Sequence, residues 1–225
     1  MYLAAAALGN KVFFAGGLNA FISPAVSSTV EIYNLSNNTW SQANLSKARL
    51  NISAIPLGNK IYFAGGEIEP FGSSSRIDIY DQTNASWTTS ELLENKTGIA
   101  GIAYGGKIYC AGGANFQFNS NNTRNVEIID VNNGYTSISC LTHPVDWSYI
   151  SQGAVLKNDK LVFLNGNSAY PNQFDIYNIS DNTWTTGILP FPIINGVVIS
   201  VNNVIYVAGG YVNGQLSNKV YKLEF

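Results

Sequence analysis

The stretch Asn59–Gly66, NKIYFAGG, ends a run of apolar residues in two glycines. Four other segments repeat this signal: KVFFAGG ending at Gly17, KIYCAGG at Gly113, KLVFLNG at Gly166 and VIYVAGG at Gly210. Counted between the last glycines, the spacings are 49, 47, 53 and 44 residues. Self-similarity at a period of about 50 residues is typical of repeat architectures such as propellers. Five copies of the signal therefore fill the chain of 225 residues.

A second landmark follows each of the first four glycine signals in the same order. It is another apolar run, followed by a polar turn and an aromatic residue. The runs are VEIYNL, IDIYDQ, VEIIDV and FDIYNI, and the aromatic residues are Trp40, Trp87, Tyr135 and Trp184. Short runs rich in β-branched and aromatic residues predict strands, and no segment predicts a helix. Each unit is therefore expected to contain four short strands.

These residues resemble the kelch repeat, in which Gly-Gly follows an apolar strand, a tyrosine-containing strand comes next and a turn closes on tryptophan. The resemblance covers essentially residues 1–225 and implies an all-β, kelch-type β-propeller, with each unit a four-stranded blade around a central axis. We expect one domain of five units, at approximately 1–46, 47–93, 94–142, 143–187 and 188–225. Asn165 replaces the first glycine of unit four, and Tyr135 replaces the tryptophan of unit three.

The propeller explains why the glycine signal is so apolar. Blades are covered on both faces by their neighbours, so the middle strands can be apolar continuously instead of alternating. Glycine at the end of the strand has no side chain, which allows the backbone to bend or a neighbouring aromatic ring to approach closely.

The two ends of the chain do not match each other. Met1 aligns with Leu50 at the entrance to a first strand, whereas Phe225 falls in the third strand of unit five. The last unit is therefore expected to lack its outer strand. Three explanations stay open: a three-stranded last blade, a chain that is a fragment, or another molecule that covers the exposed edge, which would otherwise invite pairing.

Composition excludes several classes of function. Charged residues make up 12% of the chain and the formal net charge is −2, so no electrostatic footprint for nucleic acid is present. Residues 187–218 carry no charge, but the prolines and asparagines within them favour strands and turns over a membrane span. The opening MYLAAAAL fits the repeat and is kept as part of the fold.

A binding site is expected on one face of the propeller. Antiparallel order places the connections from second to third strands on the same face as the connections between units, and these are the longer loops. Long loops on a rigid scaffold commonly carry binding residues. Rings and guanidinium groups in these loops suit a peptide or a glycan. The candidate binding residues are Phe71, Phe116, Phe118, Trp147, Tyr170, Phe191, Tyr211, Arg76 and Arg124.

Catalytic and metal chemistry find less support in the sequence. His143 is the only histidine, and no GxSxG nucleophile motif accompanies it. Kelch-like copper oxidases of the galactose oxidase type need more than one imidazole. Sialidase-type propellers use three arginines, and Arg49, Arg76 and Arg124 are expected instead to be separate surface charges. No Cys or His cluster indicates zinc, and no glycine loop indicates a phosphate site, so no catalytic residue, metal or cofactor is predicted.

The cysteines and sequons bear on the compartment. Cys110 and Cys140 are predicted to be buried free thiols in the second and fourth strands of one blade, because the third strand separates them. Eight N-x-S/T sequons and the low charge favour an extracellular location over a cytoplasmic one. The sequons lie at Asn34, Asn37, Asn44, Asn51, Asn84, Asn95, Asn121 and Asn178.

The sequence as a whole favours a non-catalytic binding or assembly module, since kelch repeats most often serve as interaction scaffolds. The expected partner is a protein, a peptide or a glycan. Two alternatives stay open: a carbohydrate-active or oxidative enzyme with its site on the same face, and a structural unit that associates with itself through the open edge of unit five. Fold alone does not separate them.

Overall fold

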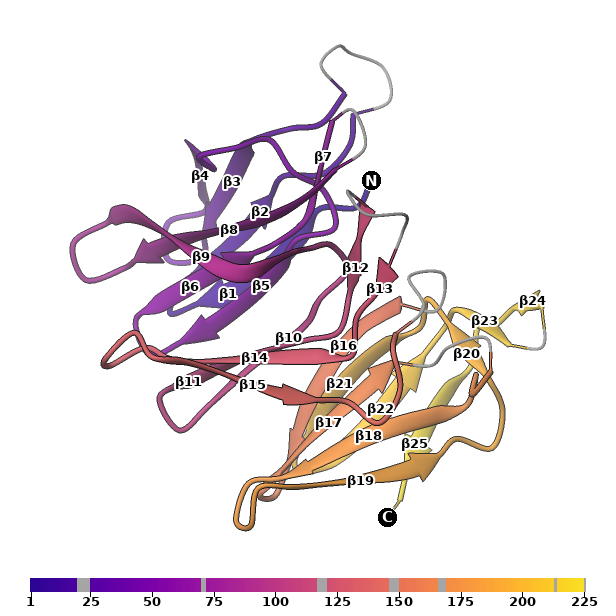
Figure 1. The fold of residues 1–225 in the computed structure, drawn as a ribbon. Helices are drawn as coiled ribbons and strands as arrows, with labels where there is room; N and C mark the ends of the chain where they lie inside the picture. Colours follow the sequence, from indigo (N-terminus) through magenta and orange to yellow (C-terminus); the bar gives the residue numbers. More distant parts are fainter. Residues whose placement is uncertain are drawn as a thin grey trace.

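The structure is a computed structural model that describes residues 1–19, 25–69, 72–116, 121–145, 150–165, 169–212 and 214–224. The described residues form strands β1–β25 and no α-helix (Figure 1). Among these residues, therefore, no helix is long and apolar enough to cross a membrane. All strand pairs are antiparallel, and the sheets follow one another along the chain as expected for the blades of a kelch-type propeller.

The first two sheets are complete four-stranded blades. In each, the strands pair in chain order from the inner strand to the outer strand. Blade 1 consists of β1 (Ala4–Leu8), β2 (Lys11–Ala15), β3 (Thr29–Asn34) and β4 (Thr39–Asn44). Blade 2 consists of β5 (Ser53–Leu57), β6 (Lys60–Ala64), β8 (Gly72–Asp81) and β9 (Ser86–Lys96), with β7 (Glu67–Ile68) pairing with the start of β8.

Blades 3 and 4 repeat this pattern, and blade 5 has three strands. Among the described residues, the sheet of the last unit contains no fourth, outer strand, in agreement with the expectation. Blade 3 consists of β10 (Ala100–Tyr104), β11 (Lys107–Ala111), β14 (Asn125–Asp130) and β15 (Thr136–Cys140). Blade 4 consists of β16 (Ile150–Lys157), β17 (Lys160–Asn165), β18 (Gln173–Asn178) and β19 (Thr183–Ile188). Blade 5 consists of β21 (Val197–Val201), β22 (Val204–Ala208) and β25 (Val220–Leu223).

The two ends of the blades differ in the turns and loops that they carry. Two-residue turns join the first strand of a blade to the second, and they contain Gly or Asn with positive φ, such as Gly58 (φ 59°) and Asn203 (φ 63°). Such turns match the twist of the flanking strands. The opposite ends carry short additional strands: β12 (Ala114–Asn115), β13 (Asn121–Asn122), β20 (Ile193–Ile194), β23 (Tyr211–Val212) and β24 (Gln215–Leu216).

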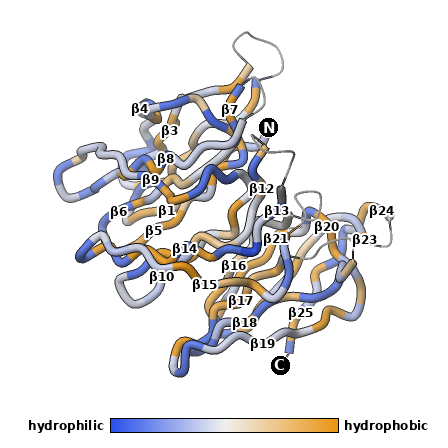
Figure 2. The backbone as a smooth tube through the Cα atoms, viewed as in Figure 1, coloured by the Kyte–Doolittle hydropathy of each residue, from blue (hydrophilic) through white to orange (hydrophobic). Residues whose placement is uncertain are grey.

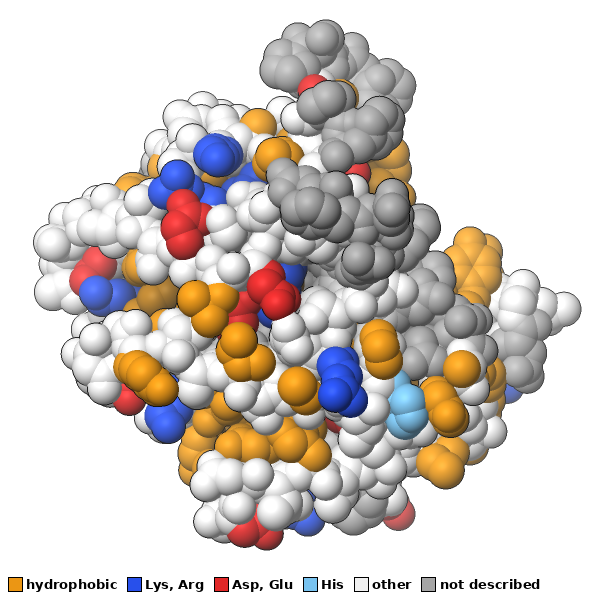
Figure 3. Space-filling view, in the orientation of Figure 1, with side chains coloured by type: hydrophobic (Ala, Val, Ile, Leu, Met, Phe, Trp, Pro, Cys, Tyr) orange, Lys and Arg blue, Asp and Glu red, His pale blue; other side chains and the backbone are white. Residues whose placement is uncertain are grey.

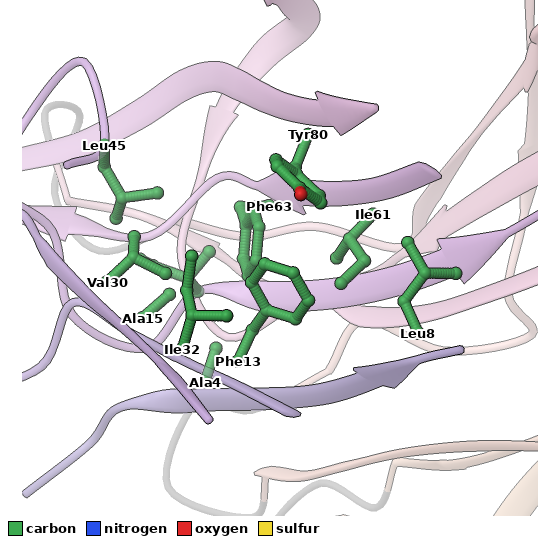
Figure 4. Packing of buried hydrophobic residues seen from close by; sticks show 11 residues of the cluster. Ala4, Leu8, Phe13, Ala15, Val30, Ile32, Leu45, Ile61, Phe63 and Tyr80 are labelled. Atoms are coloured by element: carbon green, nitrogen blue, oxygen red, sulfur yellow. The ribbon is translucent and has the colours of Figure 1, made fainter. Parts of the chain in front are cut away.

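The core lies between blades. We call the side of a blade that is turned toward the next blade its trailing face, and the opposite side its leading face. Leu8, Phe13 and Ile32 on the trailing face of blade 1 pack against Phe63 and Tyr80 on the leading face of blade 2. The rings of Phe13 and Tyr80 have centroids 4.9 Å apart, and Figure 4 shows Phe13 pointing toward Phe63.

Three further clusters fill the remaining junctions in the same way. The inner strands β1, β5, β10, β16 and β21 contact one another in this order. Figure 2 shows hydrophobic residues along the strands and hydrophilic ones at the tips of the hairpins. The blades are therefore held together by apolar surface removed from water.

The double glycine is enclosed by two successive connections between blades. Gly65 and Gly66 both have positive φ, 65° and 110°. A Cβ on Gly66 would lie 2.8 Å from the carbonyl oxygen of Leu50, in the connection before blade 2, and one on Gly65 would lie 2.6 Å from that of Lys96, before blade 3. The expected bend is confirmed, but the close neighbours are backbone carbonyls and aliphatic groups rather than an aromatic ring.

Buried carboxylates fix the connections at three junctions. Each one lies in the third strand of a blade and accepts a hydrogen bond from a backbone N–H of the segment that leads into that blade, which is the connection at Ser46 and Thr142 and the end of β9 at Leu93. Such bonds satisfy a buried donor and a buried acceptor together. The pairs are Ser46 N with Asp78 Oδ1 (2.8 Å), Leu93 N with Glu127 Oε2 (2.6 Å) and Thr142 N with Asp175 Oδ1 (3.0 Å).

Two of these carboxylates are also ion-paired. Arg49, with no exposed surface, donates to Asp78, and buried Lys96 lies 3.0 Å from Glu127. Burial lowers the pKa of the Arg49 guanidinium, and the charge of Asp78 opposes that shift. The expectation that Arg49 is a surface charge was therefore wrong. Its sequence neighbours, Ala48 and Leu50, gave no sign that a carboxylate of the next blade would reach it.

The fourth junction uses a different solution. Pro190 stands where the other connections present their N–H, and proline has no N–H to satisfy. Tyr221 stands in the register of the carboxylates, opposite Val207. Its ring meets the edge of Phe191 at a centroid distance of 4.4 Å. Donor and acceptor are thus absent together, so no buried polar group loses its partner.

Candidate functional site on the long-loop face

The candidate site lies on the face formed by the connections between blades and the loops between second and third strands. We call it the long-loop face. Figure 1 shows β7, β12, β13, β20, β23 and β24 gathered on this side, away from the tips of the two-residue turns. The connection of residues 141–145 and the start of β18 meet here, and they bring the only histidine of the chain to this face.

Polar contacts hold His143 in place. Its Nδ1 lies 3.0 Å from Oγ1 of Thr142 and 3.2 Å from Nε2 of Gln173. The hydroxyl of Thr142 donates to Oδ1 of Asp175 at 2.6 Å. Since that proton is committed to the carboxylate, the hydroxyl oxygen is left to accept, either from the imidazole or from Gln173, whose Nε2 lies 3.3 Å away.

This arrangement positions a ring rather than activating a hydroxyl. A nucleophilic hydroxyl would donate its proton to the imidazole, whereas Thr142 donates to Asp175. Burial raises the pKa of the Asp175 carboxyl, and the hydrogen bonds from Thr142 oppose that shift. The carboxylate therefore anchors the connection, and the connection in turn orients His143.

The outer side of His143 carries a second ring. Tyr170 packs against the imidazole with ring centroids 4.0 Å apart and an interplanar angle of 38°, and 46% of its surface is exposed. The backbone of exposed Arg124 lies beside this connection, because its carbonyl accepts from the N–H of Leu141 at 2.8 Å, two residues before His143 in the sequence. Figure 3 shows the histidine in pale blue among hydrophobic side chains. We call His143, Tyr170 and Arg124 the aromatic patch.

The other predicted binding residues divide into exposed and packed groups. Tyr211, in β23, is 44% exposed. Phe191 is half-buried and packs on Tyr221 within the core between blades 4 and 5. Phe116 is also half-buried, and its N–H donates to Oγ of Ser73 at 2.9 Å. Arg76 forms an ion pair with Glu91 at 3.1 Å.

Three predicted binding residues, Phe71, Phe118 and Trp147, lie outside the described residues. Of the predicted set, the structure places Tyr170 against a histidine that the sequence left as an ordinary loop residue, and it places the backbone of Arg124 beside the same connection. The missing signal was the acidic residue of the VEIY-like run. Asp175 in FDIYNI determines where the connection before its blade is held, and so where His143 lies.

The cysteines match the predicted placement in part. Both are free, in β11 and β15 of blade 3, with β14 between them. Cys110 is buried, and burial raises the pKa of its thiol to about 12. Cys140 is only half-buried, against the expectation of two buried thiols, because it ends the outer strand of its blade. Within the described ranges, no three His, Cys, Asp or Glu side chains are grouped to hold a metal ion.

Comparison with known proteins agrees with this architecture. The family model described as the Kelch motif matches residues 1–44. That range contains the strands of blade 1, and the same strand order recurs in the sheets of blades 2, 3 and 4. A search of curated proteins finds no significant match to the chain. The matched motif covers blade 1, and the repeated antiparallel sheets of the following blades support a kelch-type β-propeller fold.

Proposed function

We propose that the chain is a non-catalytic binding module that takes an extended protein segment on its long-loop face, at the aromatic patch. Kelch repeats commonly mediate protein interactions, which supports the class of function. The observation that supports the location is the packed pair of His143 and Tyr170. The imidazole is held by polar contacts with Thr142 and Gln173, and the ring of Tyr170 is exposed.

The chemistry of the patch suits one kind of peptide. A ring that is already held in place loses little conformational freedom when a ligand packs on it, so more of the contact energy contributes to affinity. Exposed tyrosines are frequent anchors of protein interfaces. The guanidinium of Arg124 can bind a carboxylate through two parallel hydrogen bonds. The segment that fits best carries an aromatic or apolar side chain close to an acidic one.

A peptide display library selected on the immobilised chain would test this proposal. Peptides retained by the unaltered chain are then measured on Tyr170→Ala and Arg124→Ala. Both side chains have exposed surface, so these variants should fold. We expect aromatic and acidic residues to be enriched in the selected peptides, and each substitution to weaken binding by about tenfold or more, the effect of losing one anchor.

Tyr135→Ala is the matched control. Tyr135 is 69% exposed and lies at a short turn between β14 and β15, on the opposite side of the blade from the long loops. Peptides should bind this variant as well as the unaltered chain. Equal losses in Tyr135→Ala and Tyr170→Ala, or a selection that recovers no peptide while a glycan array does, would contradict the proposal.

A further inference from the structure

The trailing face of blade 5 exposes inner-strand residues whose equivalents at the internal junctions are buried or half-buried. On β21, the side chains of Val197, Ile199 and Val201 are 64%, 51% and 48% exposed. In blade 1, the same register positions are held by Ala4 and Leu8, next to β2, and these are 6% and 8% exposed. The difference is not in the residues, which are apolar in both blades. It arises because blade 1 has a blade packed on its trailing face.

The leading face of blade 1 is also not covered by another blade. It carries Phe14, Tyr33 and Trp40, whose rings contact one another, with centroid distances of 6.0 and 4.9 Å to Trp40. Blade 2 carries the equivalent rings, and there the phenylalanine and tyrosine, Phe63 and Tyr80, are 0% and 3% exposed. Trp40 itself is 60% exposed.

Internal junctions show how closely two such faces approach. Gly101, on the leading side of β10, leaves no room for a side chain, because a Cβ there would lie 2.2 Å from Oγ of Ser53 in the inner strand of blade 2. Ala5 occupies the same register in β1 and is exposed. The other internal junctions hold Ala54, Ala154 and Val198 at this position, so Ala5 falls within the range of residues that a junction accommodates.

We propose that a second copy of this chain covers these surfaces, with the trailing face of blade 5 of one copy packed on the leading face of blade 1 of the other. Every internal junction already joins a trailing face to a leading face. The proposed contact continues that series across two chains. It is heterologous, since each copy contributes a different surface.

Charge favours this pairing over contact between two leading faces. Glu31 lies on the leading face of blade 1, in the register of Asp78. It is half-buried and accepts from Nε2 of Gln42 at 2.6 Å. The trailing face of blade 5 carries Lys222 where blade 1 has Ile32. Lys222 also forms an exposed ion pair with Glu224 at 2.7 Å. Two leading faces would bring two Glu31 carboxylates together, whereas a trailing face on a leading face places Glu31 in the same interface as the Lys222–Glu224 pair.

The test measures mass in solution by sedimentation across a range of protein concentrations. The unaltered chain should rise from 24.3 kDa to twice that mass or more. Ile199→Asp alters the trailing face of blade 5, and Ala5→Asp alters the leading face of blade 1. Both positions are exposed, so neither charge enters the folded core of one copy. Each variant should weaken association by about 100-fold or more, because a charge would be buried without a partner.

Mixing the two variants gives the decisive result. Each then keeps the face that the other has lost, so one intact contact forms and assembly stops at two copies. Ile138→Asp is the matched control, since Ile138 is 53% exposed on β15, away from both faces, and this variant should associate normally. Val197→Asp and Ala7→Asp serve as second variants if either first choice fails to fold.

Three results would overturn the proposal. The unaltered chain could remain at 24.3 kDa at all concentrations. Ile199→Asp or Ala5→Asp alone could associate as the unaltered chain does, which would place the contact elsewhere. The mixture could fail to form pairs, which would exclude the contact between unlike faces.

Discussion

Replacing Arg49 with methionine tests the buried ion pair between blades 1 and 2. Methionine keeps much of the side-chain volume and removes the charge. Asp78 is then left as a carboxylate whose side chain is 3% exposed, and it keeps the hydrogen bond from the N–H of Ser46. The carbonyl oxygens that accept from the guanidinium also lose a donor; they belong to Phe63, Gly65 and Arg76.

Removing one member of a buried pair typically costs about 3–5 kcal/mol, because the other charge stays buried. We expect a loss of this size in the free energy of unfolding for Arg49→Met. With a urea m-value of about 2 kcal/mol/M, the midpoint should fall by roughly 1.5–2.5 M. Tryptophan fluorescence is a suitable signal, since Trp87 and Trp184 lie half-buried against the clusters between blades.

Asp78→Asn completes a double-mutant cycle. The amide oxygen can still accept from Ser46, but the charge is gone, so it should rescue Arg49→Met while destabilising the chain that retains Arg49. We expect a coupling energy of about 2–3 kcal/mol, within the range for residues in contact. Arg76→Met is the control, because its pair with Glu91 is partly exposed and should be worth less than about 1 kcal/mol. The reasoning fails if Arg49→Met costs no more than Arg76→Met, or if the cycle is additive.

Three further outcomes are expected. In native protein at pH 8, the thiol of Cys110 should resist a disulfide reagent until the chain unfolds, because its pKa is raised to about 12, while half-buried Cys140 reacts first; equal rates would be inconsistent with this. Burial raises the pKa of the Asp175 carboxyl above 3.8, so its contribution to stability falls as pH rises from that value through the folded pKa. A plot of the free energy of unfolding against pH should therefore be flatter for Asp175→Asn over this interval. An unchanged slope would count against this reasoning. Gly66→Ala should destabilise the chain by about 1–3 kcal/mol more than Gly58→Ala, since both have positive φ but only Gly66 has a carbonyl where Cβ would lie; equal midpoints in thermal unfolding would disprove it.

The strands and their order could be predicted from the sequence because both are local. Runs such as KIYFA carry their own period and end in glycine, and their five copies fixed the number of blades. The missing outer strand of blade 5 followed from counting landmarks. None of this needed knowledge of which residues meet across a junction.

The contacts between blades were beyond such reasoning because they join residues about 30 apart. Arg49 and Asp78 lie 29 residues apart, and Thr142 and Asp175 lie 33 apart. A single sequence does not show that either pair of residues is in contact. The candidate site suffered from the same limit, since His143 is placed by Asp175 and covered by Tyr170. Phe191 was chosen as a binding residue for its loop position, and only packing against Tyr221 reveals that it is half-buried.

The polar contacts differ from one junction to the next, so the blades are not interchangeable. A carboxylate meets an arginine at the first junction, a lysine at the second and a threonine hydroxyl at the third, and at the fourth a tyrosine stands opposite a proline connection. Exchanging two blades would set Pro190 against an acid with no N–H to bind, or leave Lys96 facing a phenol. The interfaces themselves therefore specify the order of the blades, and a chain that carries the same units in another order should fold less stably.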